Sequence, residues 1–215
     1  MITGVVALQL SAGWVQISGS GALEAGPGRF FGEFILASVV FLSIGVYEEV
    51  LVRGYQMTNV AEGLRIRPLG GKGALAGALV VSSVAFGLLH AVNPGYSVLA
   101  LVNITLIGVL VLGLAYALTG RLGFPIGLHT SWNFALSCVF GLPFSGVRTG
   151  EYPVLITSGA GPELWTGGAF GPEGGLLGTL AIVAGCIGLL IWVRLREGLI
   201  ALQTDLARPP EGPES

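Results

Sequence analysis

The stretches of sequence that contain no Lys, Arg, Asp or Glu restrict the fold more than any other feature. Four of them run over residues 34–47, 73–120, 122–147 and 174–193. A helix that crosses a bilayer needs about 20 predominantly apolar residues, and the second stretch is long enough for two such helices, separated near residues 93–95. We therefore expect five spanning segments, at residues 34–53, 74–92, 96–118, 124–140 and 176–193.

Composition agrees with a membrane protein and excludes several other classes. Hydrophobic residues make up 53% of the 215 residues and charged residues only 10%, whereas a soluble domain carries about 25% charged residues. This balance also excludes intrinsic disorder. A net charge of -2 without any basic run argues against a nucleic-acid partner. The predicted fold class is all-α, a polytopic transmembrane bundle of five to six helices that has the lipid bilayer as its surroundings.

Three regions follow from this pattern. Residues 1–33 form a weak N-terminal hydrophobic segment and an outer loop, in which residues 1–18 are a marginal sixth span because they include Gln9 and Gln16. Residues 34–195 form the helical core. Residues 196–215 are expected to be a disordered tail.

Basic residues set the expected orientation of these spans. They gather in the 53–72 loop, at Arg121 and in the C-terminal tail, three regions that alternating spans place on one side. Loops rich in Lys and Arg stay in the cytoplasm. We therefore expect a multi-pass protein of the cytoplasmic membrane with a cytoplasmic C-terminus.

Polar residues interrupt the apolar segments at three places. These are the sequences EEVLVR at 48–53, FGLLH at 86–90 and HTSWN at 129–133, and the second and third contain the only two histidines of the chain, His90 and His129. An ionisable group in the bilayer costs roughly 2.5–3.5 kcal/mol even on the lenient insertion scale. Their presence in predicted spans therefore indicates a functional site.

Helical spacing assigns partners within two of these clusters. Glu49 and Arg53 are four residues apart, so they share a face and can form a salt bridge. Glu48 is rotated by about 100° from Glu49, which leaves it free for chemistry. His129 and Asn133 are also four residues apart, so that the imidazole and the amide lie side by side.

Depth in the membrane gives a further test of whether the clusters meet. If the first two long helices turn near Pro68, Glu48 lies 20 residues before the turn and His90 lies 22 residues after it. At 1.5 Å per residue both would then lie about 30 Å from the turn. The first helix must continue far beyond Arg53 for this to hold. His129 lies only about 9 Å beyond its own turn by the same rise, so the two hairpins must project unequally if all clusters converge.

The three clusters match the patterns EExxxR, FxxxH and HxxxN, in that order. Together they resemble the CAAX protease and bacteriocin-processing family of intramembrane proteases, also called the Abi family, to which type II CAAX prenyl proteases are related. The resemblance runs from about residue 30 to 195. It includes the sequence LWTGGAFGPEGG at residues 164–175.

This resemblance implies an intramembrane endopeptidase and a role for each matching residue. Glu48 and His90 would activate a water molecule, while His129 and Asn133 would hold the oxyanion of the tetrahedral intermediate. Glu49, Arg53 and Phe86 would support these groups. Relatives suggest a peptide or membrane-protein substrate, either a prenylated C-terminus or a bacteriocin peptide, and they leave the oligomeric state open.

Two readings of the cofactor stay open at this point. The family is often labelled metalloprotease, and Glu48, His90 and His129 could hold a divalent metal such as zinc with one open position. The HExxH pattern of many zinc proteases is absent. Activation of water by glutamate and histidine without a metal is the other reading.

Two other functions also fit a membrane bundle with polar residues inside. One is a catalytically silent immunity or scaffold protein of the same fold, although such a protein would have no need of all four polar residues. The other is a transporter, which commonly shows two related halves. No such repeat occurs in this sequence.

Overall fold

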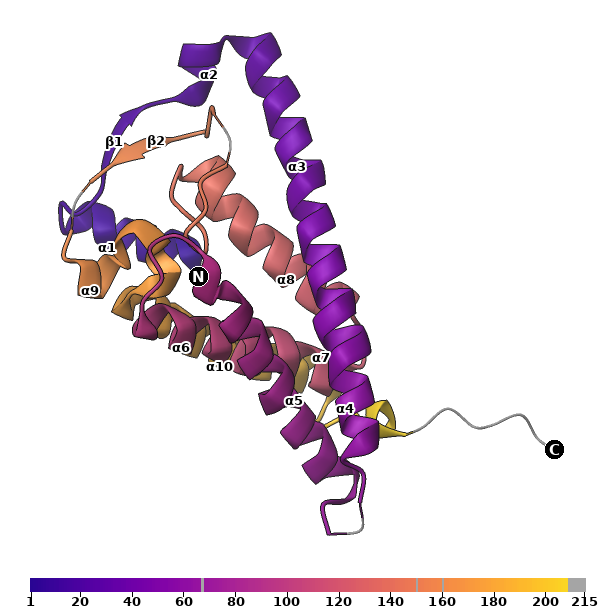
Figure 1. The fold of residues 1–215 in the computed structure, drawn as a ribbon. Coiled ribbons are helices and arrows are strands. Elements are labelled where there is room, and N and C mark those ends of the chain that lie inside the picture. The colour runs from indigo at the N-terminus through magenta and orange to yellow at the C-terminus, as the bar shows by residue number, and fades with distance from the viewer. Residues whose placement is uncertain (67, 150, 160, 209–215) are drawn as a thin grey trace.

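The computed structural model describes residues 1–66, 68–149, 151–159 and 161–208, which form a helical protein with one small sheet (Figure 1). Within these described ranges, four helices are long and apolar enough to cross a membrane. The predicted class, a helical membrane bundle, is therefore confirmed. These four helices cover Pro27–Gly63, Gly70–Val92, Val98–Thr119 and Leu176–Glu197.

The first of these helices is longer than its predicted span. It consists of α3 (Pro27–Glu49), a π-helical stretch η1 (Val50–Met57) and α4 (Thr58–Gly63), which follow one another without a break. The helix thus continues far beyond Arg53, as it must if Glu48 and His90 are to lie at the same depth. Arg53 was counted among the loop charges, but it lies inside this helix and is fully buried.

The next two spans form a hairpin of helices as predicted. α5 (Gly70–Leu89) ends in a single 3-10 turn, η2 (His90–Val92), and the chain then bends at residues 93–97. Ser97 caps the following helix by accepting a hydrogen bond from the backbone N–H of Ala100. That helix consists of α6 (Val98–Ile107), η3 (Gly108–Gly113) and α7 (Leu114–Thr119).

The fourth predicted segment forms a shorter helix that packs closely on α3. It consists of α8 (Gly123–Phe134) and η4 (Ala135–Val139). A Cβ atom on Gly45 of α3 would overlap the hydroxyl oxygen of Thr130 on α8 and lie 3.3 Å from the Ile126 carbonyl oxygen. Glycine therefore permits a helix approach that a larger residue would prevent. The last span is α10 (Leu176–Glu197).

The N-terminal segment is not a spanning helix. α1 (Ile2–Ser11) has 10 residues, which corresponds to about 15 Å, half of the hydrocarbon thickness. Residues Gln16–Gly19 form strand β1, which pairs antiparallel with β2 (Ile156–Ser158). The marginal sixth span at 1–18 was therefore wrong, because its helix ends at Ser11 and a turn and strand β1 follow. A short helix, α2 (Gly21–Ala25), leads into α3.

Among the described residues, three short helical turns lie between β2 and α10. They are α9 (Glu163–Thr166) and the 3-10 turns η5 (Gly168–Phe170) and η6 (Pro172–Gly174). After α10 a further 3-10 turn, η7 (Thr204–Ala207), places Ala207 in full burial among residues of α4 and α5. The predicted disordered tail also includes residues 209–215, which lie outside the described residues.

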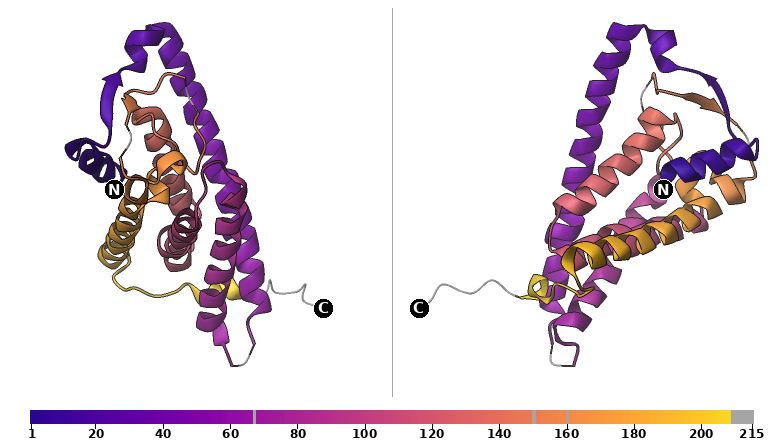
Figure 2. Two further views of the ribbon diagram at one scale, coloured as in Figure 1. Left: turned by 60° about the vertical axis from the view of Figure 1, so that its left-hand side comes forward. Right: turned by 180° about the vertical axis from the view of Figure 1, so that it is seen from behind.

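The helices are arranged as two layers that diverge toward one end. Figures 1 and 2 show the first long helix and the layer of α6 and α10 approaching one another near α4 and α7 and separating toward β1 and β2. α8 lies between them, packs chiefly on α3 and also contacts η3 and α7. One apolar core fills this space and involves Phe41, Leu136 and Ile182.

Candidate active site

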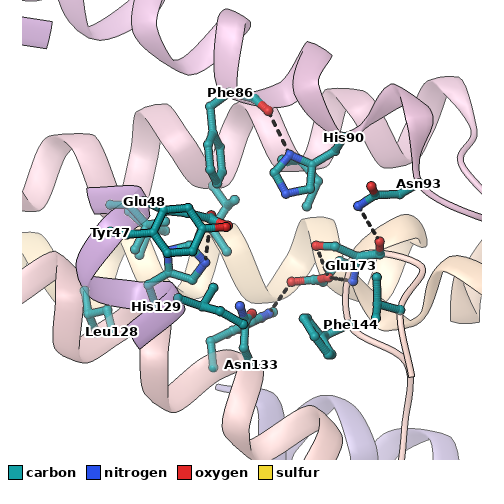
Figure 3. A pocket seen from close by; sticks show the side chains of 18 of the residues that line it. Tyr47, Glu48, Phe86, His90, Asn93, Leu128, His129, Asn133, Phe144 and Glu173 are labelled. Atoms are coloured by element: carbon teal, nitrogen blue, oxygen red, sulfur yellow. Dashed lines mark hydrogen bonds and ion pairs between the residues drawn. The ribbon is translucent and has the colours of Figure 1, made fainter. Parts of the chain in front are cut away.

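A cavity of about 250 Å³ lies where α3, α5 and α8 come together. Figure 3 shows its polar side chains pointing toward one another from these separate helices. The four residues of the predicted catalytic set all line it, and so does Phe86; the four are Glu48, His90, His129 and Asn133. Sequence spacing alone left their convergence undecided, and the structure brings them together around one space.

Glu48 and Glu49 point in different directions, as helix geometry requires. The Glu48 side chain is 20% exposed, accepts a hydrogen bond of 2.9 Å from the Tyr47 hydroxyl, and has its Oε2 3.7 Å from Nε2 of His129. Glu49 is fully buried, and its Oε1 accepts a 2.9 Å hydrogen bond from Nη1 of Arg53. The predicted Glu49–Arg53 pair is thus present, and Glu48 alone of the two carboxylates faces the cavity.

His129 lies between these two carboxylates. Its Nδ1 is 2.8 Å from Oε1 of Glu49, on the side away from the cavity. A hydrogen bond at one ring nitrogen fixes the orientation of the imidazole and decides which nitrogen is left for chemistry. Glu49 therefore directs Nε2 of His129 toward Glu48 and the cavity. Helical spacing within α3 gave no indication of this contact between α3 and α8.

Phe86 joins the three clusters through its ring. The guanidinium carbon of Arg53 lies 4.6 Å from the ring centroid, a cation–π contact. The His90 and His129 rings lie edge-on to it, with centroids at 4.7 and 6.1 Å. Phe86 thus forms a common wall for both imidazoles.

The tautomer of His90 follows from its main-chain partner. Nδ1 of His90 lies 2.8 Å from the carbonyl oxygen of Phe86. Because a carbonyl oxygen only accepts, Nδ1 must carry the proton. The neutral ring then has Nε2 as its acceptor, and this nitrogen is available to a water molecule.

Asn133 completes the set on α8, one turn after His129. Its residue is only 6% exposed, yet it lines the cavity. Within the described part of the chain its amide makes no hydrogen bond to another residue. The amide therefore remains available to a ligand in the cavity.

Glu173 is a lining residue that the sequence did not reveal as part of the site. It belongs to η6, just before α10, and it is 4% exposed. Trp132 and Ser145 donate hydrogen bonds to its carboxylate. The sequence signal was an isolated acid in the glycine-rich run GPEGG, at the end of the segment 164–175 that the family resemblance includes.

The predicted zinc ligands do not form a metal site as they stand. Among the described residues, no group of three His, Cys, Asp or Glu side chains is placed to hold a metal ion. Nδ1 of His90 contacts the Phe86 carbonyl oxygen and Nδ1 of His129 contacts Glu49, which leaves Nε2 of each ring for a ligand. Because these side chains are not grouped closely enough to share an ion, we derive no step through a metal.

The comparisons with known proteins agree with the order of the motifs. The family described as type II CAAX prenyl endopeptidase Rce1-like matches residues 30–135, about half of the chain. This region contains all three motifs but not Glu173. No curated protein matches the chain, and no solved structure does. The match confirms the predicted resemblance at the level of the CAAX-type intramembrane proteases.

Proposed function

We propose that this chain, which belongs to the Rce1-like type II CAAX prenyl endopeptidase family over residues 30–135, is an intramembrane endopeptidase. One observation carries the proposal. Three helices bring a carboxylate, two imidazoles and an amide to the same largely apolar cavity, and these residues are Glu48, His90, His129 and Asn133.

In the proposed reaction Glu48 is the general base. Its carboxylate removes a proton from a water molecule in the cavity, while Nε2 of His90 accepts the second hydrogen bond of that water and aligns it. The hydroxide attacks the carbonyl carbon of the scissile peptide bond. General-base assistance of this kind contributes about 10²–10⁴-fold to the rate.

The oxyanion that forms needs hydrogen-bond donors, and His129 and Asn133 supply them. In the proposal His129 carries protons on both nitrogens, donating Nδ1–H to Glu49 and Nε2–H to the oxyanion. The Asn133 amide donates the second bond. The C–N bond then breaks, and Glu48 returns its proton to the leaving amine. Apolar walls exclude bulk water, which strengthens these interactions.

The proposed substrate is a peptide or a segment of a membrane protein that enters from the bilayer. The family name points to a prenylated C-terminal sequence, and the apolar cavity walls suit a chain with a hydrophobic modification. We place the basic ends of the helices in the cytoplasm. In support of this orientation, the α4–α5 turn, the α7–α8 turn and the end of α10 lie at the same end of the molecule (Figure 1).

The decisive experiment measures peptide-bond hydrolysis by the purified protein in liposomes. The substrate is a library of peptides with and without a prenylated cysteine near the C-terminus. Glu48→Gln should lower the rate by about 10³-fold or more, because it removes the base without changing the shape of the side chain. Glu33→Gln on the same helix is the matched control, since Glu33 makes only a partly exposed ion pair with Arg29.

Three results would contradict the proposal. Equal cleavage by wild type and Glu48→Gln would show that Glu48 is not the base. Absence of cleavage by a folded wild type across the library would favour the silent scaffold of the same fold. Solute flux across the same liposomes, abolished by Glu48→Gln, would instead favour a transporter.

A further inference from the structure

Glu173 is a buried carboxylate in the candidate active site that has no cation beside it among the described residues. Its Oε1 accepts a 2.7 Å hydrogen bond from Nε1 of Trp132. Its Oε2 accepts bonds from the backbone N–H of Ser145 and, at 2.9 Å, from the Ser145 hydroxyl. Three neutral donors thus hold a charge that would be costly to bury alone. Figure 3 shows the side chain pointing into the cavity.

The main chain around Glu173 is fixed as firmly as its side chain. The amide of Asn103 on α6 donates hydrogen bonds of 2.8 and 2.9 Å to the carbonyl oxygens of Glu173 and Gly175. Gly171 adopts a φ of +96°, and a Cβ there would overlap the carbonyl oxygen of Pro143. The glycine-rich run therefore lets the chain fold tightly enough to place this carboxylate against the turn that contains Ser145.

The contact with Trp132 connects Glu173 to the predicted oxyanion donor. Trp132 immediately precedes Asn133 on α8, and both residues are buried. The indole hydrogen bond crosses from α8 to a segment that α6 holds in place. It therefore restrains rotation and translation of the α8 turn that carries the Asn133 amide.

We propose that Glu173 is a positioning residue that fixes α8 through Trp132, so that the Asn133 amide points at the oxyanion. This inference rests on the proposed function, because it assumes that Asn133 stabilises an oxyanion. Glu173 lies outside residues 30–135, the region that the family match covers. The proposal thus extends the site to a segment just before the last helix.

Glu173→Gln tests the restraint with little change of shape. A glutamine has one carbonyl oxygen and an NH₂ group that cannot accept a hydrogen bond. It therefore cannot accept hydrogen bonds from both Trp132 and Ser145 in the way that the carboxylate does. A displacement of about 1 Å can cost up to 10²-fold in rate. We expect kcat to fall about 10–100-fold with little change in KM, since a bond made only in the transition state is weakened. Glu163→Gln, an exposed acid in the same outer segment, is the matched control.

A double-mutant cycle with Asn133→Ala separates positioning from a general structural role. If Glu173 acts through Asn133, the double variant should be as slow as Asn133→Ala alone, because coupled residues are not additive. Multiplied losses would overturn the proposal. A rise in KM at constant kcat would also overturn it, because Glu173 would then contact the substrate.

A measurement without substrate keeps this test independent of the proposed function. Hydrogen–deuterium exchange of the α8 amides should be faster in Glu173→Gln than in wild type and unchanged in Glu163→Gln. Unchanged exchange in both variants would overturn the restraint. If wild type cleaves no peptide but exchange rises as expected, the proposed function fails while the restraint on α8 stands.

Discussion

Two carboxylates are buried beside the same cavity, and they are held in opposite ways. Glu49 belongs to the helical wall, formed by α3, α5 and α8, and pairs with the guanidinium of Arg53. Glu173 belongs to the loop wall, formed by residues 144–147 and 171–175. In the part of the chain that the structure describes, it accepts bonds only from the neutral groups of Trp132 and Ser145.

The difference shows how each wall gains its rigidity. On the helical wall the two charges are four residues apart on one helix, so the partner comes with the helix itself. On the loop wall every donor comes from a segment distant in sequence, so the carboxylate is satisfied only after the tertiary structure forms. The helical wall therefore depends on charge pairing, and the loop wall on hydrogen-bond geometry.

Loss of the cation on the helical wall should have the larger effect on stability. Arg53→Met keeps much of the apolar bulk but removes the guanidinium from the buried Glu49, which then keeps only its contact with Nδ1 of His129. Breaking a buried pair in this way costs about 3–5 kcal/mol. On the loop wall, Ser145→Ala removes one donor to Glu173 and should cost about 1.5 kcal/mol. Denaturant unfolding of both variants in detergent measures the two free energies of unfolding.

The order of these two values tests the comparison. If Arg53→Met lowers the free energy of unfolding by no more than Ser145→Ala does, the ion pair adds little to the stability of the helical wall. Arg29→Met serves as a control for the lost charge, since Arg29 makes ion pairs that are largely exposed. Such surface pairs contribute about 0–1 kcal/mol.

The helical wall could be predicted from the sequence because its signals are local. Charge-free stretches indicated the spans, and the i,i+4 spacing indicated the Glu49–Arg53 pair. The motif order indicated the family that the comparison confirms. Asn133 and His129 could be placed on one face of one helix for the same reason.

The loop wall could not be predicted because no local spacing encodes it. Glu173 meets Trp132, 41 residues earlier in the sequence, only after the glycine-rich segment has folded against α6. The contact of His129 with Glu49 spans 80 residues and depends on the close packing of α3 and α8. The strand pairing of β1 with β2 was missed for the same reason, since neither strand is long enough to show alternation.

Close packing of α3 on α8 brings Glu49 within reach of His129, and Gly45 makes that packing possible. Gly45→Ala should lower stability by about 1–3 kcal/mol, because the added methyl group overpacks the Thr130 hydroxyl. Gly32→Ala is the matched control on α3, where a Cβ meets nothing within 4 Å. It should raise stability by up to about 1 kcal/mol through helix propensity.

A second substitution decides whether the methyl contact itself is responsible. The Thr130 hydroxyl is buried without a hydrogen-bond partner in the described structure. Thr130→Ala should therefore restore part of the stability that Gly45→Ala loses. Equal stability changes in Gly45→Ala and Gly32→Ala would mean that α3 and α8 can separate without cost, and the helical wall would then be less rigid than the geometry indicates.

The smallest effect should come from removal of divalent metal. Among the described residues, no three His, Cys, Asp or Glu side chains are placed to hold a metal ion. We therefore expect 1,10-phenanthroline to leave the cleavage rate unchanged, with the non-chelating 1,7 isomer as control. A loss that added zinc reverses would contradict this expectation. Such a loss would require Glu48, His90 and His129 to move together on substrate binding. The Glu49–Arg53 ion pair would then support a metal site rather than a pair of residues that activates water.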